Sequence, residues 1–144
     1  MSTETSWPLV VTGLEEFMKR IGLKCERREE EASFSNKLLR YTGEFMAVRV
    51  VSDRGIWFIE VANVNAGAGQ WYDVAIIRDL LFGSGEDVLS LEKQVDFIEC
   101  NWLAVSRCFS PPEWQHTSAQ LTLLRNERTR RRLPGFFSPP AQIN

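Results

Sequence analysis

The sequence predicts an α+β fold, in which an antiparallel meander of three to four strands carries an N-terminal helix and three C-terminal helices on one face. Strand-like segments are grouped between residues 24 and 63 instead of alternating with helices. The segment 45–63 is the richest in β-branched and aromatic residues, and helical periodicity lies on both sides of it. This grouping is typical of helices packed against an antiparallel sheet.

A first helix is expected directly after Trp7 and Pro8. Proline suits a first helical turn, where its missing N–H costs little. Gly22 fits the left-handed position just past the helix end. Apolar residues spaced four, three and four apart form the predicted inward stripe: Val10, Leu14, Phe17 and Ile21.

The charged segment 24–34 fits either a helix or a solvated strand by composition, and we favour a charged edge strand because it follows a helix stop. Residues 37–42 read as the next strand. The segment 45–63 reads as a hairpin that turns at Asp53-Arg54-Gly55.

Alternation in the second strand of that hairpin separates two faces. Trp57, Ile59 and Val61 share one apolar face, which we expect to meet the helices. Glu60 belongs to the opposite, more polar face.

Three helices are predicted after the strands. Asp73 is a candidate N-cap for a short helix over 74–82, and Ser90 for one continuous helix over 91–109. Proline opens a third helix that runs through about Arg132. We expect residues 1–135 to form a single domain and residues 136–144 to form an irregular, proline-broken tail.

Charge and cysteine content narrow the function classes. Residues 1–112 carry 12 basic and 17 acidic residues, a balance of -5, whereas residues 113–144 balance at +3. An acidic body, whose one cluster of five arginines lies at the end of the last predicted helix without aromatic residues between them, disfavours nucleic acid. The 3 cysteines are widely spaced, which indicates free thiols and a reducing cytoplasm. No apolar run reaches the roughly 20 residues of a membrane span, so no membrane partner is expected.

No motif predicts catalysis, a metal site or a cofactor. His116 is the only histidine, and no cysteine pair has metal-binding spacing. The glycine loop 65–69 would need a third glycine where Tyr72 stands to match a dinucleotide-binding fingerprint. A small-ligand protein or enzyme with a pocket near residues 65–73 remains an alternative, because glycine loops often carry contacts.

The favoured interpretation is a small protein-binding module. Carboxylates on an acidic surface can attract a basic protein partner, and neighbouring aromatic rings can anchor it. Rings at helix entries can equally serve as hydrophobic staples. A structural or assembly subunit is a further alternative. The candidate partner-binding residues are Glu44, Glu60, Trp71, Tyr72, Asp73, Glu86 and Asp87.

Two segments carry a family resemblance. WYDVAIIRDLLFG at 71–83 and LEKQVDFIECNWLAVSRCFS at 91–110 resemble small bacterial immunity proteins of polymorphic and contact-dependent toxin systems. The shared motifs are patterns of apolar residues with Trp and Asp-Leu-Leu, so the resemblance assigns no functional residue to this sequence. The resemblance implies a cytoplasmic, non-enzymatic α+β protein that binds a cognate partner.

Overall fold

The computed structural model describes residues 7–31, 36–66, 70–83, 85 and 88–132. Within them the chain forms a helix, a five-stranded antiparallel meander in the order β1-β2-β3-β4-β5, and then four helices. The predicted α+β fold is confirmed. The elements are α1 (Leu9–Arg20), β1 (Lys24–Glu31), β2 (Asn36–Thr42), β3 (Met46–Asp53), β4 (Ile56–Asn63), β5 (Tyr72–Asp73), α2 (Val74–Phe82), α3 (Leu91–Cys100), α4 (Trp102–Phe109) and α5 (Pro111–Arg132).

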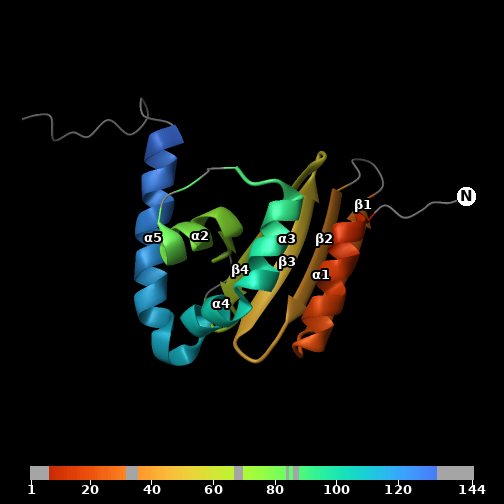
Figure 1. The fold of residues 1–144 in the computed structure, drawn as a ribbon, viewed down its shortest axis with the longest axis horizontal. Coiled ribbons are helices and arrows are strands. Elements are labelled where there is room, and N and C mark those ends of the chain that lie inside the picture. The colour runs from red at the N-terminus through yellow and green to blue at the C-terminus, as the bar shows by residue number, and fades with distance from the viewer. Residues whose placement is uncertain (1–6, 32–35, 67–69, 84, 86–87, 133–144) are drawn as a thin grey trace, which may run out of the picture.

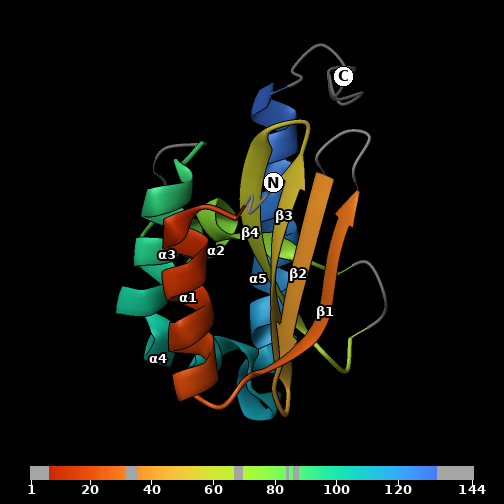
Figure 2. The same cartoon turned by 90° about the vertical axis from the view of Figure 1, so that its right-hand side faces the viewer.

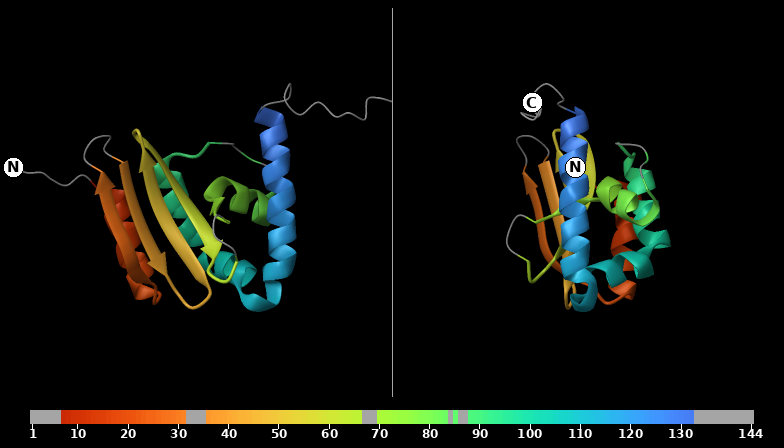
Figure 3. Two further views of the ribbon diagram at one scale, coloured as in Figure 1. Left: turned by 180° about the vertical axis from the view of Figure 1, so that it is seen from behind. Right: turned by 90° about the vertical axis from the view of Figure 1, so that its left-hand side faces the viewer.

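The molecule has two layers (Figures 1 and 2). Helices α1, α3 and α4 lie on one face of the sheet, and the described helices leave the other face uncovered. Helix α5 stands beyond the β4–β5 end of the sheet, against α2 and α4 (Figure 3). No helix in the described ranges is long and apolar enough to cross a membrane.

The core lies between the sheet and the helices. Strand register places Tyr41 beside Val48 and Val48 beside Val61, and all three are fully buried. Ile59 is also fully buried, so the predicted inward face of β4 is confirmed, with Trp57 half-buried at its end. The helices complete the core with Val11, Leu14, Met18, Ile77, Ile98, Val105, Phe109 and Leu121.

The prediction of one continuous helix over 91–109 is wrong, because this segment forms two helices, α3 and α4. Asn101, with φ -118° and ψ 21°, separates α3 from α4. Its side-chain amide donates to the Phe97 carbonyl at 3.0 Å, and its backbone N–H donates to the same oxygen. Asparagine competes for backbone groups in this way. Helix α4 therefore turns away from α3 and leads to α5 (Figure 1).

Smaller differences concern the first helix and the strands. The fully buried positions of α1 are Val11, Leu14 and Met18, while Val10 and Ile21 are only partly buried. Gly22 has φ +96°, as its predicted place past the helix end requires. The edge-strand interpretation of residues 24–34 is confirmed for the described part, which forms the edge strand β1 over Lys24–Glu31, and residues 32–34 lie outside the described residues. The two-residue strand β5 was not predicted, and the predicted tail at 136–144 lies outside the described residues.

The carboxylate of Glu15 is buried between α1 and the first two strands. Glu15 of α1 is 9% exposed and accepts hydrogen bonds from Arg28 of β1 at 2.7 and 2.8 Å and from the Tyr41 hydroxyl at 3.0 Å. The hydrogen bond with Glu15 raises the pKa of Arg28. Burial, followed by the bond to Glu15, raises the pKa of Tyr41. This network ties α1 to the first two strands.

A buried glutamine completes the edge of β4. Beyond the short β5, Gln94 of α3 accepts from the Ile59 N–H at 2.7 Å and donates to the Trp57 carbonyl at 3.2 Å. These two backbone groups are the ones that a longer neighbouring strand would satisfy. Gln94 also donates to the Leu89 carbonyl at 3.0 Å, and so joins the sheet to the start of α3.

Candidate functional site

A row of charged residues crosses the sheet on the face away from the helices. Consecutive register pairs join Arg27 to Arg40, Arg40 to Arg49, Arg49 to Glu60, and Glu60 to Asp73. Paired residues of neighbouring strands project to the same side, so all five strands contribute to one line. We call the sheet face that carries this row the open face.

The charges of the open face are paired with one another. Arg49 contacts Glu60 at 2.6 Å, Arg40 contacts Glu26 at 2.8 Å, and Arg27 contacts Glu29 at 2.6 Å. Such partly exposed ion pairs contribute at most about 1 kcal/mol each to stability. Their main effect is to fix the direction of the side chains and to leave the open face close to neutral.

Trp71 lies on the open face, between β4 and β5 in the chain. The guanidinium of Arg49 lies 4.2 Å from the centre of its ring, and that of Arg40 lies 5.9 Å away. Arg125 of α5 donates a hydrogen bond to the Trp71 carbonyl. Cation–π contacts of this kind contribute about 0.5–1 kcal/mol at exposed sites. Arg40 and Arg49 thus hold the indole ring and Arg125 holds the Trp71 backbone, while the side chain stays half-buried.

Two hollows flank Trp71. The first, of about 490 Å³, is lined by Arg40, Thr42, Ala62, Gln70 and Trp71, among others. The second, of about 380 Å³, is lined by Arg49, Glu60, Trp71, Asp73, Ile76, Arg125, Arg128 and Thr129.

A cross-strand apolar row lies beside the charged one, where Leu38, Val51 and Phe58 are neighbours in register and half-buried. Together with the ring of Trp71 it gives the open face apolar area between paired charges.

The structure brings three of the predicted residues together. Glu60, Trp71 and Asp73 line the same hollow. Asp73 also caps α2 through a hydrogen bond from the Ile76 N–H at 3.1 Å, as its sequence position predicted. Glu60, however, is neutralised by Arg49, so the site is a mixed-charge face and not the expected acidic one.

The other predicted residues lie elsewhere. Tyr72 is 2% exposed and packs in the core beneath Arg125, away from the surface that Trp71 and Asp73 share. It alternates with Trp71 and Asp73, and alternation sends it inward. Glu44 is exposed in the β2–β3 turn, outside both hollows. Glu86 and Asp87 lie outside the described residues.

Arg128 is the most unexpected residue of the site. Its side chain is 4% exposed and contacts Asp79 of α2 at 3.0 Å, although its sequence neighbours suggested a solvated helix end. A signal was present, because Arg128 continues the inward spacing of Leu121 and Leu124. Its burial joins α5 to α2 beside the second hollow.

Unpaired acidic residues gather on α3 instead of on the open face. Glu92, Asp96 and Glu99 are all exposed, and none of them makes an ion pair among the described residues. Their spacing of four and three places them on one side of the helix. That spacing is visible in the sequence.

The open face offers binding groups, namely guanidinium donors, carboxylate acceptors and an indole. In the ranges that the structure describes, no group of three or more His, Cys, Asp or Glu side chains is placed to hold a metal ion. No protein-family model, curated protein or solved structure matches the chain, so its interpretation depends on its own residues.

Proposed function

We propose that this chain is a small protein-binding module that presents the open face of its sheet to a partner protein, with Trp71 as the central contact. The observation that carries the proposal is the indole ring stacked on Arg49 at 4.2 Å and half-buried among paired charges. Tryptophan and arginine dominate the binding energy of many interfaces. A ring that is already fixed loses little freedom on binding.

The partner in this proposal is a basic protein, and the chain acts as its immunity or inhibitor protein. Residues 1–112 carry a balance of -5, which favours encounter with a positively charged surface. The resemblance of residues 71–110 to immunity proteins supports this form of the proposal. The three free cysteines support action in the cytoplasm.

Co-expression with the product of a neighbouring toxin-like gene tests the proposal. The partner is separated from the purified complex and titrated by calorimetry with the normal chain, with Trp71→Ala, and with Leu9→Ala as a control that is 88% exposed in the helical layer. Trp71→Ala should weaken binding at least about tenfold, the effect of losing a modest hot spot. Equal affinity for the Trp71 and Leu9 variants contradicts the proposal.

A small-ligand protein is the second candidate, favoured by the hollow of about 490 Å³. Its size falls within the roughly 300–1,000 Å³ of ordinary ligand pockets. A metabolite panel read by thermal melting tests it, with Gln70→Ala as the variant inside the hollow and Leu9→Ala outside it. A ligand that stabilises the normal chain and the Leu9 variant but not the Gln70 variant would favour this candidate.

A further inference from the structure

The helical layer carries an apolar groove on the side of the molecule away from the open face. It measures about 510 Å³ and lies where the end of α1 meets the junction of α3 and α4. Phe17 and Trp102 pack edge to face at 6.1 Å in it, and Leu103 lies beside them with 78% of its surface exposed. An exposed leucine next to two aromatic rings is typical of an interaction surface.

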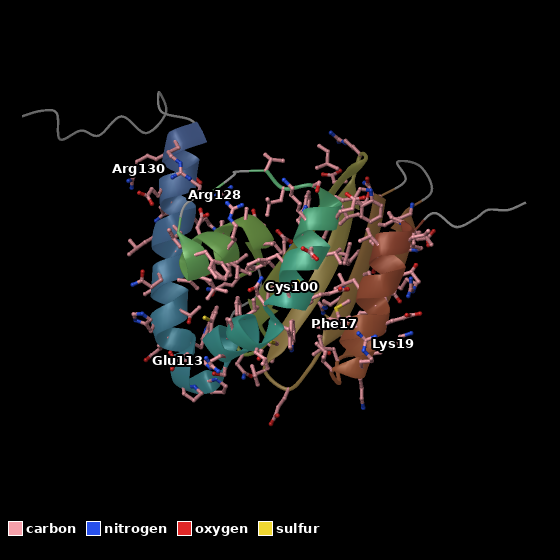
Figure 4. The ribbon with its side chains drawn as sticks, in the orientation of Figure 1. Phe17, Lys19, Cys100, Glu113, Arg128 and Arg130 are labelled. Carbon is pink, nitrogen blue, oxygen red and sulfur yellow. The ribbon has the colours of Figure 1, made fainter. Side chains whose placement is uncertain are left out.

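Residues of opposite charge flank this groove at the ends of α1 and α3. Along α3, Glu92, Asp96 and Glu99 are exposed, and Glu99 lines the groove itself. At the end of α1, Lys19 and Arg20 are exposed, and the guanidinium of Arg20 lies 5.8 Å from the Phe17 ring centre. Figure 4 shows Phe17 between Cys100 on the α3 side and Lys19 on the α1 side.

We propose that this groove is a self-association surface, on which a second copy of this chain docks by two-fold symmetry. A two-fold interface uses the same patch on both subunits, so the patch must complement itself. An apolar groove flanked by Glu99 on the α3 side and by Arg20 at the end of α1 meets that requirement. The helical layer also exposes Phe82 at 66%, which adds apolar area outside the groove.

The direction of the helices selects the symmetry axis. Helices α1 and α3 lie side by side and run in the same direction (Figure 1). A two-fold axis parallel to them places α3 of each copy on α1 of the other, and so brings Glu99 to Arg20. An axis across them would place α3 on α3 and oppose like charges, which is unfavourable. The charges at the groove end of the two helices, Glu99 and Arg20, therefore favour the first arrangement.

Sedimentation of the purified chain over a broad concentration series tests the proposal. The expected result is a reversible monomer–dimer equilibrium that Leu103→Asp shifts to monomer. The control is Leu123→Asp, which changes another exposed leucine, on α5. A chain that stays monomeric at every concentration overturns the proposal. This holds even if the groove then proves to bind a different protein.

Charge reversal tests the orientation. Arg20→Glu and Glu99→Arg should each raise the dimer dissociation constant about tenfold, since each reversal turns two symmetric attractions into repulsions. An equimolar mixture of the two variants should restore dimerisation, because each altered side chain then faces its opposite. Glu113→Arg and Arg130→Glu on α5 are the matched controls. A dimer that is unaffected by either groove reversal contradicts the arrangement.

Crosslinking through Cys100 is an independent test of whether two copies meet at the groove. Cys100 is exposed and lines the groove, so a short bis-maleimide should join two copies in a Cys25→Ser chain, and Leu103→Asp should abolish the product. The nearby charge of Asp96 raises the pKa of Cys100, so the reaction is run at mildly alkaline pH. Trp71→Ala should leave the crosslink unchanged, which separates a failure here from a failure of the proposed function.

Discussion

Glu15 shows how one buried side chain can govern the attachment of a helix. Its carboxylate is satisfied by Arg28 and the Tyr41 hydroxyl at 2.7 to 3.0 Å. A buried charge is tolerated only with such partners, and removing one partner leaves the others unsatisfied. The next residue, Glu16, is exposed on the same helix and provides a matched comparison.

We predict that Glu15→Ala lowers the free energy of unfolding by about 1–3 kcal/mol, because the Tyr41 hydroxyl loses its acceptor in a buried site. Glu16→Ala should change it by less than about 0.5 kcal/mol. Urea denaturation of both variants measures the difference. Equal effects would show that the buried network contributes nothing to stability.

We predict that the free energy of unfolding falls at alkaline pH because of Tyr41. Burial and the Glu15 carboxylate raise its pKa in the folded chain above the value of about 10 for an unfolded tyrosine. The contribution of Tyr41 to the free energy of unfolding is therefore complete below about pH 10 and is lost as the pH rises further. Above that pH the unfolded chain releases the tyrosine proton, whereas the folded chain retains it. Tyr41→Phe should flatten this decline. Urea denaturation at pH values on either side of about 10 measures it, and an unchanged decline contradicts the assignment.

Gln94 shows, at the scale of elements, how a helix substitutes for a missing strand. Strand β5 covers only Glu60 and Val61 of β4. Where it ends, the side-chain amide of Gln94 bonds the N–H of Ile59 and the carbonyl of Trp57. Helix α3 is thus fixed to the sheet by hydrogen bonds as well as by apolar packing, and the edge of β4 is protected.

We predict that Gln94→Met lowers the free energy of unfolding by about 1–3 kcal/mol, because the buried N–H of Ile59 loses its acceptor. Glu92→Met, at an exposed position of the same helix, is the control. Guanidinium denaturation measures the free energy of unfolding of both variants. Light scattering measures their solubility, because an unprotected edge of β4 promotes aggregation. A Gln94 variant as stable and as soluble as the Glu92 variant would refute this role.

The faces of the long strands were predictable because alternation in β3 and β4 is regular and one face is apolar. The break between α3 and α4 at Asn101 was not predictable, because the apolar spacing from Ile98 to Trp102 and Val105 continues across it. A two-residue strand such as β5 is too short to show any periodicity. Local patterns therefore predict the faces of elements better than their ends.

The candidate site was only partly predictable because it depends on register between strands. Alternation placed Glu60 on the outer face, but its pairing with Arg49 requires a two-residue turn at Arg54-Gly55, which the expected turn at Asp53-Arg54-Gly55 did not fix. The position of Trp71 over β3 depends on the path of the connection from β4 to β5. Burial of Tyr72 follows from β5, whose existence the sequence did not reveal.

At the scale of the whole molecule, we predict one cooperative unfolding transition. Helix α5 is attached through the fully buried Leu121 and through the Arg128–Asp79 ion pair. Leu121→Ala should lower the free energy of unfolding by about 2–5 kcal/mol, the usual range for a buried leucine. Circular dichroism and tryptophan fluorescence should report the same midpoint in this variant. Separate midpoints would show that α5 unfolds independently of the sheet.

The strand order has a consequence for synthesis on the ribosome. Every strand pairs with its neighbour in the chain, so the meander can assemble in the order in which it is made. Its inner face, with Val48, Val50 and Ile59, still waits for α3 and α4, which end at Phe109. At about 5–20 residues per second, the part of that apolar face that α1 does not cover stays exposed for several seconds. The nascent chain in this interval is the form of the protein most exposed to aggregation and to chaperones.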